Sequence, residues 1–257
     1  PVEKEYGYSV FSTVFYAEFL NKKLNVIDCP GADDFVGNAI TALNVTDTGV
    51  ILVDAQYGVE VGTQNIFRTT AQLKKPVIFA VNQLDGEKAD YDNTIEQMRE
   101  IFGNKVVPIQ YPLACGPGFN AMIDVLLMKK YSWGPDGGVP TIEEIPAQEL
   151  DKAQELHQAL VEAAAENDET LMEKFFEQGH LTEDEMREGI RKGLVGGVFN
   201  IKGAERGRIH IVRLNASDRK VMYITNESNA PVMESTMLCS PFLKTANTSR
   251  VANVNTG

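Results

Sequence analysis

Short apolar runs bounded by polar residues recur through the first half of the chain. They occupy residues 23–28 (KLNVID), 49–54 (GVILVD) and 76–82 (PVIFAVN). Continuous apolar runs of this length are typical of strands that are buried on both faces. Between them lie two helix-like stretches, residues 35–45 and 62–74, and the second carries Ile66, Thr70 and Leu73 at helical spacing. Strands that alternate with helices predict an α/β fold with a doubly wound, mostly parallel sheet.

The alternation continues in the second half, where we expect a helix over residues 91–102 and a strand over 106–111. A cluster rich in Gly and Pro at residues 134–140 (GPDGGVP) predicts a surface loop or a subdomain boundary. From Pro146 the composition becomes strongly helical, and one apolar stripe predicts an amphipathic helix that docks on another part of the protein. The stripe contains Leu150, Ala153, Leu156, Leu160, Val161 and Ala164.

A helix start and two strands are expected beyond that stripe. Residues 182–185 (TEDE) form a capping box, in which the Thr hydroxyl and the Glu carboxylate accept hydrogen bonds from free backbone N–H groups. The capping box predicts a helix over residues 183–194. After Gly196 and Gly197 the pattern becomes β-like at residues 208–214 (RIHIVRL) and 220–225 (KVMYIT).

Composition and charge narrow the classes of protein. The formal net charge of −12 disfavours a protein that coats nucleic acid, because such binding needs clustered Lys and Arg. No CxxC motif occurs among the three widely spaced cysteines, which are Cys29, Cys115 and Cys239. This spacing disfavours a disulfide framework and a zinc site. Neither a run of 18 apolar residues nor a signal-peptide pattern occurs, so we expect a cytoplasmic protein that does not cross a membrane.

Two polar motifs follow buried strands of the predicted sheet. Asp28, Pro30 and Gly31 belong to the first (DCPG), and Asn82, Gln83 and Asp85 to the second (NQLD). The carboxyl ends of parallel strands are where open α/β sheets bind ligands. Each motif alone could be an ordinary turn or loop, but their order and their strand-end placement favour a functional site.

The chemistry of these side chains matches that of GTPases. A DxPG pattern there places a carboxylate near a phosphate-bound Mg²⁺, and the Gly N–H meets the γ-phosphate. An NKxD pattern reads guanine, because the Asp carboxylate accepts hydrogen bonds from the ring and exocyclic N–H groups of the base. The candidate nucleotide-binding residues are therefore Asp28, Pro30, Gly31, Asn82, Gln83 and Asp85, and Asp28 is also expected to contact Mg²⁺ indirectly.

The motifs give the chain a specific resemblance to the elongation factor G family of translational GTPases. Residues 26–35 (VIDCPGADDF) resemble the family's switch-two segment, and residues 78–85 (IFAVNQLD) resemble its guanine-recognition segment. Residues 145–194 are similar to the helical subdomain inserted into that family's nucleotide domain. Residues 234–241 (ESTMLCSP) are similar to a strand of the β-barrel domain that follows.

The resemblance implies a domain organisation, ligands and a partner. It implies a GTP-binding domain over residues 1–195, with a helical insertion at about 134–194, and a partial β-barrel domain and tail over 196–257. It also implies GTP or GDP with Mg²⁺ as ligands and the ribosome as the partner. Neither DNA nor a membrane is expected as a partner.

The chain departs from the family at three places. No GxxxxGK[ST] phosphate loop occurs in it, and the family carries that loop upstream of the segment matched here. The family's Ser-Ala loop is missing after Leu194, which leaves open a natural deletion there or a discontinuous sequence. Ala32 occupies the position of a histidine that orients the attacking water, and Gln83 replaces a lysine. No residue is therefore assigned as catalytic.

Three hypotheses remain open from the sequence. The first is part of a translocation factor that binds GTP and hydrolyses it poorly or not at all. The second is a regulatory or scaffold protein that keeps the GTPase fold without binding nucleotide. The third is an unrelated doubly wound enzyme with another cofactor, which the absence of GxGxxG disfavours.

Overall fold

The buried runs of the sequence are neighbouring strands of one large sheet. The computed structural model describes residues 2–19, 22–103, 106–134, 137–195, 209–211 and 220–226. Strands β3 (Thr48–Asp54) and β4 (Val77–Asn82) pair in parallel from Gly49↔Val77 to Asp54↔Asn82. Every residue of β4 is buried, as expected for a central strand covered on both faces. The predicted α/β core with a mostly parallel sheet is therefore confirmed.

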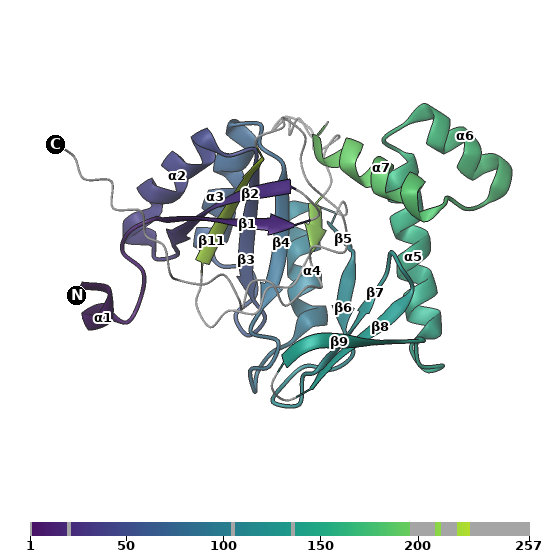
Figure 1. Cartoon of the computed structure of the whole chain (residues 1–257), viewed down its shortest axis with the longest axis horizontal. Coiled ribbons are helices and arrows are strands. Elements are labelled where there is room, and N and C mark those ends of the chain that lie inside the picture. Colours follow the sequence, from purple (N-terminus) through teal and green to yellow (C-terminus); the bar gives the residue numbers. More distant parts are fainter. Residues whose placement is uncertain are drawn as a thin grey trace.

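The large sheet has seven strands in the order β1-β2-β11-β3-β4-β10-β5 (Figure 1). β1 and β11 are antiparallel to their neighbours, and β2, β3, β4, β10 and β5 run parallel to one another. β11 thus lies between two parallel strands that follow each other along the chain. The strands not yet given are β1 (Thr13–Phe19), β2 (Lys22–Pro30), β5 (Val106–Pro108), β10 (Ile209–Ile211) and β11 (Lys220–Asn226).

The two strands expected near the C-terminus lie in this sheet. β10 pairs with β4 and β5, and β11 pairs with β2 and β3, so neither belongs to a separate barrel. All other residues of 196–257, including 234–241, lie outside the described residues. The partial β-barrel is therefore not confirmed. Sequence patterns also missed β1, an edge strand whose Val14 and Tyr16 are largely exposed.

The helices between the strands begin and end close to the expected residues. α2 packs against β2 and α3 against β3, while α4 lies beside β5 (Figure 1). Asp90 caps α4 by accepting a hydrogen bond from Asn93 N at 3.0 Å. The elements are α1 (Val2–Tyr6), the 3₁₀ helix η1 (Asp33–Phe35), α2 (Val36–Val45), α3 (Val61–Gln72) and α4 (Tyr91–Phe102).

A second sheet of four antiparallel strands follows in the order β6-β7-β8-β9. Its strands are β6 (Gln110–Pro112), β7 (Ala121–Asp124), β8 (Lys129–Gly134) and β9 (Gly137–Glu143). The prediction of a loop over 134–140 was wrong, because Gly134 pairs with Gly137 and the segment continues as β9. β9 is an edge strand, where Pro140 is tolerated.

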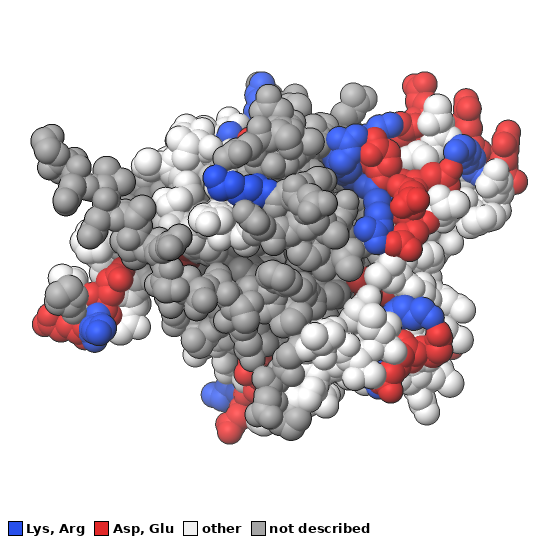
Figure 2. Space-filling view, viewed as in Figure 1, with Lys and Arg blue, Asp and Glu red and all other residues white. Residues whose placement is uncertain are grey.

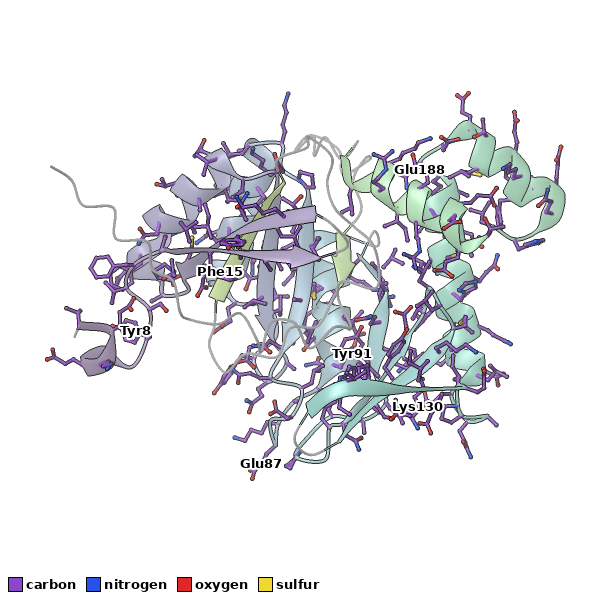
Figure 3. The ribbon with its side chains drawn as sticks, viewed as in Figure 1. Tyr8, Phe15, Glu87, Tyr91, Lys130 and Glu188 are labelled. Carbon is purple, nitrogen blue, oxygen red and sulfur yellow. The ribbon has the colours of Figure 1, made fainter. Side chains whose placement is uncertain are left out.

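The start of α4 is joined to this second sheet. Tyr91, labelled beside the sheet in Figure 3, donates a hydrogen bond from its hydroxyl to Gln110 O at 2.8 Å. Burial raises the pKa of the Tyr91 hydroxyl, so it remains a donor. The phenol therefore fixes the second sheet to the helix that follows the NQLD motif.

The C-terminal helices form an arm at one end of the sheet (Figure 1). They are α5 (Leu150–Ala165), α6 (Glu169–Gln178) and α7 (Glu183–Val195). Most of the predicted stripe on α5 is buried in the same core as the large sheet, whereas Leu150 is 40% exposed because it is the first helical residue. None of the helices in the described part is long and apolar enough to cross a membrane.

The helix α7 packs closely on α5 through a glycine. A Cβ added at Gly189 would lie 2.5 Å from the carbonyl oxygen of Ala164. We expect Gly189→Ala to lower the free energy of unfolding by about 1–3 kcal/mol, because the backbones must move apart. Urea denaturation measures the change. Gly37→Ala on the exposed face of α2 is the control, since nothing lies within 4 Å of its Cβ position, and it should be neutral or slightly stabilising.

The predicted capping box is confirmed at the start of α7. Thr182 N donates to Glu185 Oε2 at 2.9 Å, and Glu185 N donates to Thr182 Oγ1 at 3.4 Å. Acidic and basic side chains lie next to one another over α6 and α7 (Figure 2), among them the Lys174–Glu185 pair. The Lys174 ammonium, followed by the Thr182 donors, lowers the pKa of Glu185 to about 2 from its ordinary 4.5.

This lowered pKa predicts a pH dependence of stability. A carboxylate with a depressed folded-state pKa stabilises the fold above its unfolded value, and this contribution is lost as the pH falls from 4.5 towards about 2. We expect the urea midpoint of the wild type to fall more between about pH 6 and about pH 3 than that of Glu185→Gln. Glu173→Gln, at an exposed position on α6, should follow the wild type. Equal pH profiles for all three would contradict the prediction.

Candidate functional site

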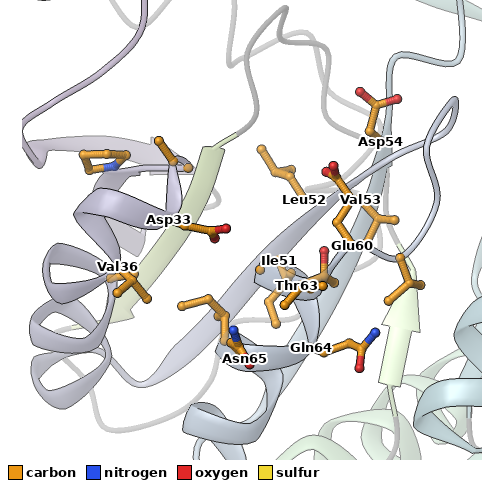
Figure 4. A pocket seen from close by; sticks show the side chains of 18 of the residues that line it. Asp33, Val36, Ile51, Leu52, Val53, Asp54, Glu60, Thr63, Gln64 and Asn65 are labelled. Atoms are coloured by element: carbon orange, nitrogen blue, oxygen red, sulfur yellow. The ribbon is translucent and has the colours of Figure 1, made fainter.

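A cavity of about 690 Å³ opens at the carboxyl ends of the central strands. It lies between α2 and α3 beside the end of β3 (Figure 4). Its volume falls within the range of about 300–1,000 Å³ that is usual for small-molecule sites. Both strand-end motifs contribute to its wall: Pro30, Gly31 and Ala32 from the first, and Asn82 and Gln83 from the second.

The DCPG segment is anchored at one end and exposed at the other. Cys29 is fully buried, and its thiol lies 3.7 Å from Asn38 O, to which it donates, and 3.4 Å from Ser12 Oγ. Burial raises the pKa of the Cys29 thiol, so it stays protonated as a packing residue. Gly31 and Ala32 are exposed, and Ala32 is extended with φ −75° and ψ 139°. The rim of the cavity is therefore accessible at the position after DxPG.

The NQLD segment is built around one buried side chain. Leu84 is 3% exposed, and its carbonyl accepts a hydrogen bond from Gly116 N at 2.8 Å. Asn82 is also buried, whereas Asp85 is exposed. Gln83 has a left-handed φ of 57°, which is uncommon outside glycine. Burial of Leu84 between two polar residues thus leaves Asp85 free to face solvent or a ligand.

Two of the predicted site residues do not line this cavity. Asp28 and Asp85 each lie within two or three residues of the lining residues Pro30 and Asn82, but they are outside the wall itself. Asp28 is half-buried two residues before the end of β2. The structure therefore brings the two motifs to one opening while their carboxylates lie beside it.

Asp54, which the sequence motifs did not single out, lines the same cavity. Its Oδ1 accepts a hydrogen bond from Gln56 N at 2.8 Å, and its side chain is 8% exposed at the end of β3 (Figure 4). The signal was present, because Asp54 ends its buried run as Asp28 and Asn82 end theirs. The strand-end rule applies to all three residues.

The cavity wall is acidic. It contains Asp33, Asp54 and Glu60, and none of its lining residues is Lys or Arg. The first turn of α3 also contributes, and no side chain caps that helix start. Asp33 lies against it, because a Cβ at Gly62 would be 2.8 Å from Asp33 Oδ1. The Asp33 carboxylate interacts favourably with the dipole of α3 at this end of the helix. Because the wall itself is acidic, phosphates bound there need positive charge from elsewhere.

No group of three or more His, Cys, Asp or Glu side chains in the described part of the chain could hold a metal ion. Mg²⁺ does not require such a group, because it commonly keeps several waters and binds one or two carboxylates together with substrate phosphates. Asp28, a half-buried carboxylate at a strand end, fits that mode. It is the protein group we would expect near the ion.

The fold and its strand-end motifs have counterparts among known proteins. Residues 1–180 match the family described as the elongation factor Tu GTP binding domain. A solved structure from Thermus thermophilus superposes with a TM-score of 0.73 at 27% sequence identity, over 84% of this chain and 31% of that one. This chain thus spans about a third of the length of that protein. Because the family match covers most of the sequence, the chain belongs to the translational GTPases that share the elongation factor Tu GTP binding domain.

Proposed function

We propose that this chain is the guanine-nucleotide-binding part of an elongation factor G-like translation factor that acts in ribosomal translocation in the cytoplasm. The observation that carries the proposal is the meeting of the DCPG and NQLD segments at one cavity. Family membership implies binding of guanine nucleotides. In this proposal residues 1–195 form the GTP-binding domain, with the helical insertion, and β10 and β11 complete its sheet. The other residues of 196–257 belong to a partial β-barrel domain and tail.

Each residue of the two motifs has a role in the proposed site. Asn82 and Asp85 read the guanine base through its hydrogen-bonding edge. Gln83 stands between them in place of a lysine, and so lacks the charged stem that packs along the nucleotide in the family. Pro30 shapes the turn that presents the Gly31 N–H to the γ-phosphate. Asp28 would hold Mg²⁺ indirectly, and the ion would supply the positive charge that the acidic wall lacks.

We further propose that GTP hydrolysis is impaired. Ala32 presents a methyl group on the cavity rim, and a methyl group can neither accept nor donate a hydrogen bond to the attacking water. Loss of a positioned acid–base group typically costs about 10²- to 10⁴-fold in rate. Binding of nucleotide does not depend on that group, so it is retained.

The test is a translocation assay with the full-length protein on ribosomes, combined with measurement of phosphate release and of GDP binding by calorimetry. We expect micromolar or tighter binding and GTP-dependent translocation with little phosphate release. Rapid ribosome-stimulated hydrolysis would contradict the impaired catalysis, and absence of any ribosome-dependent activity would contradict the translocation role.

One observation favours a second candidate, a regulatory or scaffold protein that uses the GTPase fold without nucleotide. The lining of the cavity contains three carboxylates and neither Lys nor Arg, a poor environment for a triphosphate. If this candidate is correct, calorimetry with GDP and GTP on the full-length protein will detect no binding in the presence of Mg²⁺.

A further inference from the structure

Three hydrogen bonds join the loop after β3 to the loop after β4. Ala55 N donates to Asn82 O at 2.9 Å, and Asp90 N donates to Ala55 O at 2.8 Å. Between these backbone bonds, Gln56 Nε2 donates to Gln83 Oε1 at 3.1 Å. The residues joined by this amide pair are 27 positions apart in the sequence. The loop after β3 therefore lies directly against the NQLD segment.

The backbone of Gln56 is fixed from both sides. Its N–H donates to Asp54 Oδ1 at 2.8 Å, and Gly58 N donates to Asp54 O at 2.8 Å, so the loop turns tightly on Asp54. Gly58 has a left-handed φ of 68°, and Val59 N donates to Gln97 Oε1 of α4 at 3.1 Å. A loop held in this way presents the Gln56 side chain in one direction.

The side chain of Gln56 passes over Gly86 to reach Gln83. A Cβ at Gly86 would lie 2.7 Å from Gln56 Nε2, so a side chain there would displace the Gln56 amide. Gly86 N donates to Gln83 O at 3.0 Å and closes the turn that follows Gln83. Glycine at this position leaves the space that the amide pair occupies.

Gln83 has a backbone conformation that needs such support. It adopts a left-handed backbone conformation that a non-glycine residue holds only when its surroundings enforce it. It stands between the two residues proposed to read the base, Asn82 and Asp85. A change in the Gln83 backbone would therefore alter the spacing between the Asn82 amide and the Asp85 carboxylate.

We propose that Gln56 is a positioning residue of the guanine site, which holds the NQLD segment in its base-reading conformation through the amide pair with Gln83. This inference rests on the proposed function, because it concerns recognition of the guanine base. Gln56 does not touch the base and acts only through Gln83. The hydrogen bond between these two neutral side chains thus links the loops that follow the adjacent strands β3 and β4.

The test compares GDP and IDP binding to the full-length wild type, Gln56→Ala, Gln83→Ala and the double variant by calorimetry. IDP lacks the exocyclic amine whose N–H the Asp85 carboxylate accepts in the proposed site. We expect each single variant to bind GDP about 3- to 10-fold more weakly, and the double variant to be no weaker than the weaker single one. The preference for GDP over IDP should shrink, whereas a general loss of stability lowers both affinities equally. Independent effects in the double variant, with an unchanged preference, would overturn the inference.

Two further variants serve as rescue and control. Gln56→Glu combined with Gln83→Lys replaces the amide pair by an ion pair and should restore the GDP preference, which Gln56→Glu with Gln83→Ala should not. Gln72→Ala, at an exposed position on α3, should bind both nucleotides as the wild type does. Failure of the ion pair to restore any preference contradicts the positioning role.

A readout without ligand separates this inference from the proposed function. If the wild type binds no GDP, the proposed function fails, and the coupling is then judged by hydrogen exchange alone. Gln56→Ala should raise the exchange of the Gly86 amide, which is bonded to Gln83 O, by about 3- to 10-fold. The Gly103 amide, bonded to Arg99 O in α4, is the internal reference and should not change. Unchanged exchange at Gly86 overturns the inference.

Discussion

Replacement of Asp85 by Asn is expected to weaken GDP binding by about 100-fold. In the proposed site the Asp85 carboxylate accepts two hydrogen bonds, from the ring N–H and the exocyclic amine of guanine. Hydrogen bonds to a charged group contribute roughly 1.5–3 kcal/mol each, and an amide cannot accept both while its NH₂ group faces the amine of the base. The bond to the exocyclic amine is lost and two donors then face each other, while the bond to the ring N–H loses its charged acceptor. Together these changes correspond to about a hundredfold change in the dissociation constant, taking about 1.4 kcal/mol for each factor of ten.

The same variant, Asp85→Asn, is expected to gain affinity for xanthosine diphosphate. Xanthine carries a carbonyl where guanine carries the exocyclic amine, and the Asn NH₂ group can donate to that oxygen. Calorimetry with both nucleotides therefore measures a reversal of preference in Asp85→Asn. Glu87→Gln removes the same charge from an exposed residue two positions away, shown at the outer edge of the molecule in Figure 3, and should leave GDP affinity unchanged. Equal loss in both variants would mean that charge, not base recognition, was measured.

Introduction of a histidine at position 32 is expected to raise ribosome-stimulated GTP hydrolysis by about 10²- to 10⁴-fold. Ala32 is exposed on the rim of the cavity, so the larger imidazole can be accommodated without displacing core residues. An imidazole can hydrogen-bond to the attacking water, which a methyl group cannot. Phosphate release in the presence of ribosomes measures the gain, and GDP affinity should be nearly the same in both proteins.

The control for this gain of activity is Ala32→Leu, which adds bulk without hydrogen-bonding groups. It should hydrolyse GTP as slowly as the wild type. If Ala32→His is also no faster, the missing histidine is not what limits turnover. If the wild type already hydrolyses GTP rapidly, another group positions the attacking water. Asp33, whose exposed carboxylate lies on the cavity wall, is then the first residue to mutate.

Local patterns determined the central part of the fold. Residues 49–54 and 76–82 form strands as predicted. Both faces of the sheet are covered at these strands, so their residues must be apolar throughout, and this makes them recognisable in the sequence. The Thr182 capping box was equally readable, since all of its hydrogen bonds join residues three positions apart. The hairpin of β8 and β9 was not, because its Gly and Pro residues suit a loop and an edge strand equally well.

The sequence by itself determined the order of the central strands and helices and the residues of the two strand-end motifs, because hydrophobic periodicity and turn chemistry act over a few residues. Only the tertiary structure decided that β10 and β11 join the large sheet and that Asp54 lines the same cavity as Gly31 and Asn82. It also decided the contact between Gln56 and Gln83. These pairings join segments far apart along the chain, so they depend on how the strands are ordered in space rather than on any local pattern.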